Sequence, residues 1–257
     1  MDKHLEGRAG SNAEWERWGE LDPLFGVSSW EGKRVGEAGA WTEDEFLALG
    51  AADWADFLAR WKRYGVAAGT CVEIGCGAGR MTKAMASFFS HVDGLDVSAG
   101  MLARASTVVE GLPVTLHHTD GLRFPLADAS VDAAFSTHVF QHLDTMEDAK
   151  ANWAEIVRVL RPGGTLLVHV PMHFWPGGLE QLQSVYEARR FLGDVRARIR
   201  RRNMISRGSN PIMRGQSYRW DDVEDHLERL GCSRIELSLF RVSSNHSQHC
   251  CLLATKT

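Results

Sequence analysis

The sequence predicts an α/β fold built on a doubly wound parallel sheet, and three observations support this. Residues 71–74 form a short apolar run typical of a buried strand. Three glycines at alternate positions follow, and a stretch with helical apolar spacing begins after them. Strand and helix patterns then alternate up to residue 170, which implies right-handed crossovers between parallel strands. The last of these strands, 165–170, is almost continuously apolar, as an interior parallel strand should be.

Composition excludes several classes of protein. The chain has 257 residues and a net charge of −4, which argues against a general nucleic-acid or membrane-surface protein. No run approaches 18 apolar residues, and residues 1–12 are polar, so neither a membrane span nor a signal peptide is expected. The five cysteines show no C-x-x-C spacing and are typical of reduced thiols. The sequence therefore predicts a cytoplasmic protein with no membrane or nucleic-acid partner and an undetermined oligomeric state.

The N-terminal part is predicted to be a disordered tail over 1–12 and a helical cap over 13–66. One helix is expected from Ala13 to Leu21. A second starts at Thr42, whose spacing to Glu45 forms a capping box, and runs to about Tyr64 with a break near Gly50. Five of the nine tryptophans lie before residue 55, and they either pack the cap on the sheet or form the roof of an active site.

The remaining chain is predicted to be a sheet core over 67–172 and 211–257, interrupted by a helical lid insertion over 173–210. In the core, further strands are expected at 114–118, 131–136, 165–170, 232–240 and 249–255, the last two as an antiparallel pair. Helices are expected at 99–109, about 146–160 and 220–230. The insertion holds eight arginines against two acids between 187 and 207. This segment is either a solvated helical face or a lid that favours an anionic acceptor.

The glycine-rich turn points to a particular nucleoside cofactor. The pattern is Glu73-x-Gly75-x-Gly77-x-Gly79, followed by Arg80, whereas a dinucleotide fingerprint needs G-x-G-x-x-G. It resembles motif I of the class I S-adenosylmethionine-dependent methyltransferases. Other segments also resemble this family: an acid after the second strand, an acid after the third, the D-x-x-x-S-x-H-V-x-x-H-L block at 132–143 and the R-P-G-G turn at 161–164. The similarity covers roughly 68–172 and 217–257.

The resemblance implies a seven-stranded sheet of order 3-2-1-4-5-7-6 with its last strand antiparallel, and S-adenosyl-L-methionine as the cofactor. Asp96, 19 residues after Gly77, would hold the ribose hydroxyls, and Asp120 would meet the adenine amino group. Arg80 would pair with the methionine carboxylate. The implied cofactor-binding residues are Glu73, Gly75, Gly77, Arg80, Asp96, Val97, Met101, Asp120, Gly121, Leu122, Ser136 and Thr137.

Three histidines are candidate general bases, because an oxygen acceptor must lose a proton and imidazole titrates in the right range. His142 is the first candidate, His138 the second and His173 the third. His138 and His142 are four residues apart and would share a helical face. Each of them can instead cap a helix or line the methionine pocket. No metal is expected, since Pro171 forbids a helix that would aim His169 and His173 at one ion.

The predicted function is methyl transfer to a small-molecule acceptor, with O-methylation of a metabolite, sugar or natural product favoured. N- or C-methylation by proximity alone is one alternative, and a catalytically silent cofactor-binding partner subunit is another. The N/D-P-P-Y/F motif of base-amino methylation is absent after the fourth strand, where residues 136–139 read S-T-H-V. This counts against the third alternative, an RNA or protein methyltransferase.

Overall fold

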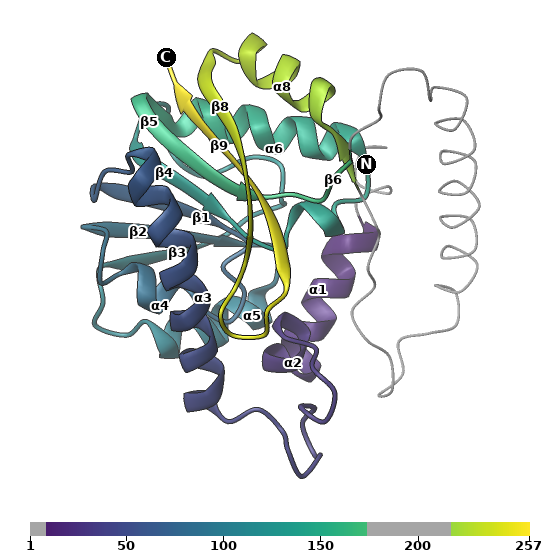
Figure 1. Ribbon diagram of the computed structural model, residues 1–257. Coiled ribbons are helices and arrows are strands. Elements are labelled where there is room, and N and C mark those ends of the chain that lie inside the picture. Colours follow the sequence, from purple (N-terminus) through teal and green to yellow (C-terminus); the bar gives the residue numbers. More distant parts are fainter. Residues whose placement is uncertain (1–8, 174–216) are drawn as a thin grey trace, which may run out of the picture.

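The computed structural model describes residues 9–173 and 217–257, and its centre is a seven-stranded sheet (Figure 1). The strand order is β3-β2-β1-β4-β5-β9-β8. Strand β9 runs antiparallel to both of its neighbours, β5 and β8, while the other pairs are parallel. This confirms the predicted sheet order. The strands are β1 Thr70–Ile74, β2 His91–Asp96, β3 Val114–His118, β4 Val131–Ser136, β5 Leu160–His169, β8 Cys232–Arg241 and β9 Gln248–Lys256.

Helices cover both faces of the sheet and form two hydrophobic cores. One core joins the sheet to α6 and α8 through side chains such as Trp153, Ile156 and Leu227. The other joins it to α3 through Trp54, Phe57 and Trp61. A smaller cluster ties α1 and α2 to the start of α3 and to α5. The helices are α1 Ala9–Leu21, α2 Pro23–Val27, α3 Glu43–Tyr64, α4 Thr82–Met85, α5 Ala99–Val108, the 3-10 turn η1 Phe140–His142, α6 Met146–Val159 and α8 Trp220–Arg229.

Several helices start where the sequence places their caps. Thr42 and Glu45 form the predicted capping box of α3, and Thr145 forms a second one with Asp148 at the start of α6. Ser98 accepts a hydrogen bond from the backbone N–H of Met101 and so begins α5 directly after β2. The cap at Ser98 therefore fixes the path of the chain as it leaves Asp96.

Other elements differ from the prediction. Helix α1 begins at Ala9, four residues before the predicted start and inside the predicted disordered tail. Helix α3 runs through Gly50 without the predicted break. The helix expected after Arg80 is only the short α4, and the R-P-G-G turn lies within β5. A second sheet, β6 Met172–His173 with β7 Tyr218–Arg219, was not predicted.

The predicted lid insertion, with its arginines, lies outside the described residues from 174 onward. Within the residues that are described, no helix is long and apolar enough to cross a lipid bilayer.

Candidate active site

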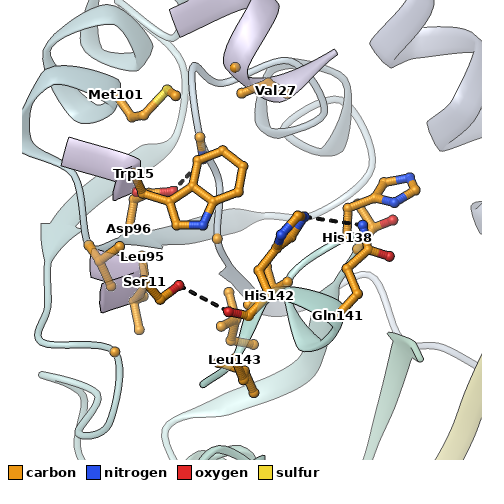
Figure 2. A pocket seen from close by; sticks show the side chains of 18 of the residues that line it. Ser11, Trp15, Val27, Leu95, Asp96, Met101, His138, Gln141, His142 and Leu143 are labelled. Atoms are coloured by element: carbon orange, nitrogen blue, oxygen red, sulfur yellow. Dashed lines mark hydrogen bonds between the residues drawn. The ribbon is translucent and has the colours of Figure 1, made fainter. Parts of the chain in front are cut away.

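A cavity of about 450 Å³ lies where the carboxyl ends of β1, β2 and β4 meet (Figure 2). Open α/β sheets bind their ligands at this edge. Its walls come from segments far apart in the sequence. They include the glycine turn after β1, the ends of β2 and β4, the turn after β3, α1, the segment after α2, α3, α6 and the loop between β8 and β9. The cavity is therefore built by tertiary packing around a local motif.

Asp96 is the buried acid at the end of β2. Its carboxylate accepts backbone N–H groups from Gly77 at 2.8 Å and from Ser98 at 2.9 Å. Burial raises the pKa of this carboxyl, while the two backbone donors act in the opposite direction. Each carboxylate oxygen can accept more than one hydrogen bond, so Asp96 retains capacity for a ligand hydroxyl.

The glycine turn brings the backbone close to other parts of the wall. Gly75 and Gly77 have φ angles of +74° and +54°, which disfavour any other residue. A Cβ on Gly75 would lie 2.2 Å from Cγ2 of Val139. A side chain at position 75 would therefore displace Val139, and both glycines line the cavity.

One end of the cavity is lined by apolar side chains and by the backbone of a turn. Val97 and Met101 line it together with the turn at 120–122. Asn12 donates to the backbone carbonyl of Asp120 at 2.9 Å, and Asn152 donates to that of Gly121 at 2.9 Å. This turn is thus held from both α1 and α6.

Helix α1 roofs the cavity, and Trp15 extends from it toward the centre (Figure 2). The indole of Trp15 contacts the ring of His142 edge-on, with 5.0 Å between ring centroids. Ser11 donates to the carbonyl of His142 at 3.0 Å, and Glu16 accepts the backbone N–H of Ala99 at 2.7 Å. Together with the bond from Asn12 to Asp120, these hydrogen bonds join α1 to η1, to the start of α5 and to the turn at 120–122.

Arg80 follows the glycine turn and is buried against α3. Its Nη1 lies 2.5 Å from Oδ2 of Asp53, which also accepts a hydrogen bond from Ser244. No acceptor in the part of the chain that the structure describes is within hydrogen-bonding distance of the Arg80 Nε. Arg80 therefore lines the cavity and has a buried donor without an acceptor among the described residues.

Glu73 and Ser136 lie behind the cavity wall and are absent from its lining. Glu73 accepts a hydrogen bond from Thr82 at 2.6 Å, and burial raises its pKa to about 7. Ser136 donates to the carbonyl of Ile74 at 3.0 Å and so joins β4 to β1. The next residue, Thr137, does line the cavity, and its buried hydroxyl has no partner among the described residues.

His138 and His142 both line the cavity but do not share a helical face as expected. His138 has a φ of +59°, so the chain turns before η1 begins at Phe140. Its ring lies 4.7 Å from that of His169 and 5.1 Å from that of His249, measured between centroids. Burial and these neighbouring imidazoles hold the pKa of His138 well below 6.5. His142 instead lies against Trp15, with its Nε2 3.2 Å from the side-chain nitrogen of Gln141.

The third candidate, His173, lies in β6, where its backbone pairs with Arg219. Twelve of the predicted site residues line the cavity: Gly75, Gly77, Arg80, Asp96, Val97, Met101, Asp120, Gly121, Leu122, Thr137, His138 and His142. Within residues 9–173 and 217–257, no group of three or more His, Cys, Asp or Glu side chains has an arrangement that could hold a metal ion.

The sequence did not single out several lining residues: Ser11, Asn12, Asp53, Asn152, Asn245, Ser247 and His249. They are ordinary polar residues in helices or loops, and nothing in their local spacing marks them. Only the tryptophans before residue 55 offered a signal, and Trp15 and Trp30 do reach the cavity.

The fold is Rossmann-like, and open sheets of this kind bind nucleotides at the strand-end edge where Asp96 lies. The model of a methyltransferase domain family matches residues 72–168, which include the glycine turn, Asp96, Asp120 and the histidine block. Residues 72–168 thus match a methyltransferase domain, which supports the resemblance to the class I S-adenosylmethionine-dependent methyltransferases.

Two curated relatives and one solved structure are similar to this chain. An uncharacterized methyltransferase of Mycobacterium tuberculosis is 32% identical over 99 residues, which cover 38% of this chain and 49% of that protein. The malonyl-[acyl-carrier protein] O-methyltransferase of Hahella chejuensis is 35% identical over 98 residues, or 37% of this chain and 34% of that protein. The chain thus spans about half or less of these relatives.

The solved structure is the magnesium protoporphyrin IX methyltransferase of Synechocystis PCC 6803 with bound S-adenosylmethionine. It has a TM-score of 0.58 and 14% identity, and the alignment covers 96% of this chain and 97% of that one. This likeness shows a shared fold.

The residues of this site fit S-adenosylmethionine. The buried Asp96 carboxylate suits ribose hydroxyls, and the glycine turn permits close approach of a ligand at Gly75 and Gly77. The unpartnered Nε of Arg80 suits a carboxylate. These three features face one cavity.

Proposed function

We propose that this chain transfers a methyl group from S-adenosylmethionine to an oxygen atom of a small-molecule acceptor. The observation that carries the proposal is the pairing of Asp96 with the glycine turn at one edge of the cavity. Asp96 would hold the ribose, Arg80 the methionine carboxylate, and the turn at 120–122 the adenine ring.

The charge of the cavity supports a cationic cofactor. Among the described lining residues, Arg80 is the single arginine or lysine, and it is paired with Asp53. Five aspartates line the same cavity: Asp53, Asp96, Asp120, Asp144 and Asp148. Such a lining attracts a sulfonium group. The expectation of an anionic acceptor rests on the arginine-rich insertion outside the described residues, and the charges described here do not add to it.

S-adenosylmethionine, when bound, supplies an activated methyl group. The residues of this chain then need to orient the acceptor and take its proton. The geometry favours His138 over His142 for the proton, because the His142 ring is engaged by Trp15 and Gln141. Burial lowers the pKa of His138, so its imidazole is unprotonated near neutral pH. The same shift makes it a weaker proton acceptor than an ordinary imidazole, so the proposed role rests on its place in the cavity wall.

Transfer of a labelled methyl group to a panel of phenols, hydroxy acids and amines tests this proposal. The expected product is an O-methyl compound, and His138→Ala should lower kcat about 10²- to 10⁴-fold while S-adenosylhomocysteine binds as before. Unchanged turnover in the alanine variants of His138, His142 and His173 would exclude a histidine base and favour N- or C-methylation. Cofactor binding without any transfer would favour a silent partner subunit.

A further inference from the structure

Arg80 and Asp53 form an ion pair that is buried on both sides. Arg80 is 6% exposed and Asp53 is 7% exposed, and their nearest atoms are 2.5 Å apart. Taking two charges out of water has a large desolvation cost, so a buried pair is weak evidence for a role in stability. The arrangement instead invites a functional explanation.

Asp53 is itself held from a second direction. Its Oδ1 accepts a hydrogen bond of 2.5 Å from the hydroxyl of Ser244, in the loop between β8 and β9. Gly50 lies three residues earlier in α3 and therefore on the same helical face. A Cβ on Gly50 would lie 2.3 Å from both Cγ and the carbonyl oxygen of Arg80. This face of α3 therefore fits Arg80. Gly50 leaves space for the aliphatic part of the Arg80 side chain, and Asp53 pairs with its guanidinium.

Arg80 also has a donor that nothing in the described chain receives. Its Nε is buried without an acceptor, and the residue lines the cavity with Gly75 and Gly77. An unpaired buried donor carries a desolvation penalty that a ligand acceptor would remove. A carboxylate matches the guanidinium best, because its two oxygens can accept parallel N–H groups.

We infer that Asp53 is a positioning residue that fixes the Arg80 guanidinium to receive the methionine carboxylate of the cofactor. The inference rests on the proposed function. Asp53 acts through Arg80, so among ligands without a sulfonium charge it affects those that carry the carboxylate.

Comparing the binding of two ligands distinguishes this positioning role of Asp53 from a general contribution to the stability of the fold. S-adenosylhomocysteine carries the amino-acid part, whereas 5′-methylthioadenosine keeps the nucleoside and the sulfur but lacks it. In calorimetric titrations, Asp53→Ala should lower the affinity for S-adenosylhomocysteine about ten- to hundredfold. This is the range expected for the loss of a hydrogen bond to a charged group. Binding of 5′-methylthioadenosine should stay within about twofold of the wild type.

Asp56→Asn is the matched control. Asp56 lies one turn further along α3 and accepts two hydrogen bonds from Ser243 of the same loop, but it does not line the cavity. This variant should leave the affinities of both ligands unchanged. If Asp53→Ala does not fold, Asp53→Asn keeps one hydrogen-bonding oxygen and should show a smaller loss of the same kind.

A double variant tests whether Asp53 acts through Arg80. Arg80→Ala should lose affinity for S-adenosylhomocysteine, and adding Asp53→Ala should cause little further loss. Equal losses for both ligands in Asp53→Ala, or tighter S-adenosylhomocysteine binding, would overturn the inference. A wild-type protein that binds neither ligand would instead overturn the proposed function.

Discussion

Glu73 and Asp96 are two buried carboxyl groups on neighbouring strands, and their surroundings give them different properties. Asp96 accepts two backbone N–H groups, whereas the side-chain hydrogen bond described for Glu73 comes from Thr82. Burial raises the pKa of both groups, and that of Glu73 reaches about 7. Glu73 therefore holds Thr82, the first residue of α4, through a hydrogen bond. Its carboxyl group titrates near neutral pH.

Glu73 should make the stability of the protein depend on pH. Its pKa in the folded protein, about 7, lies above the ordinary value of 4.5, so the folded state binds the proton more tightly than the unfolded chain. Stability should consequently fall as pH rises through this window. Glu73→Gln cannot ionise, so its free energy of unfolding relative to the wild type should rise by about 3 kcal/mol between pH 4.5 and 8.

Denaturant titrations of both proteins across that pH range measure the effect. The exposed Glu110→Gln serves as the control and should follow the wild-type curve. If the free energies of unfolding of Glu73→Gln and the wild type changed in parallel with pH, the raised pKa of Glu73 would be contradicted.

His138 leads to a prediction for the pH dependence of activity. A general base must be unprotonated, and the low pKa of His138 keeps it so well below pH 6.5. For an acceptor that does not itself titrate in this range, the acid-side decline of kcat/KM should lie below pH 6.5. An enzyme group with an apparent pKa at or above 6.5 in that profile would exclude His138 as the base.

At the scale of elements, local sequence patterns predicted where the strands lie, but they did not predict how the helices pack. Strands β3 and β4 have their predicted bounds, because each is a short run closed by turn residues. Gly50 predicted a helix break by its local preference, yet it lies in α3 because Arg80 packs against it. The grouping of His138 with His169 and His249 depends on three strands meeting, which spacing along the chain does not reveal.

Helix α1 packs on α5 through Gly19 and Gly100, and this contact should control cofactor affinity. A Cβ on Gly19 would lie 2.3 Å from the hydroxyl of Ser98 and 2.8 Å from the backbone nitrogen of Met101. Gly19→Ala should therefore displace α1 and lower the affinity for S-adenosylhomocysteine about tenfold or more, which corresponds to about 1.4 kcal/mol. Calorimetry measures this change.

Glu20→Ala, at an exposed position on the same helix, is the control and should bind like the wild type. Unchanged affinity in Gly19→Ala would show that the close packing of α1 on α5 does not govern the site.

At the scale of the whole molecule, the cavity lies between structural units that are far apart in sequence. Helix α1, the sheet edge, α3 and the loop between β8 and β9 all contribute walls. A ligand held by all of them binds the folded state alone. The family resemblance predicted the sheet and the cofactor, but not Asn12 or Asp53, whose roles depend on how these units meet.

Cofactor binding should accordingly raise the stability of the entire molecule. S-adenosylhomocysteine at 100 times its Kd should add about 2.7 kcal/mol to the free energy of unfolding. For a chain of this size that corresponds to a rise in Tm of roughly 5–10 °C. Thermal unfolding with and without ligand measures it, and Asp96→Ala should lose the rise. A wild-type Tm that stays constant at millimolar ligand would contradict cofactor binding.

Strand β9 lies inside the sheet between β5 and β8, although it comes last in sequence among the strands that the structure describes. During synthesis on the ribosome, β5 has no partner on that side until residues 248–256 have emerged from the exit tunnel. His249 and the tether from Ser244 to Asp53 arrive at the same late stage. A nascent chain stalled before residue 248 should therefore fail to retain the cofactor, because one wall of its binding site has not yet been made.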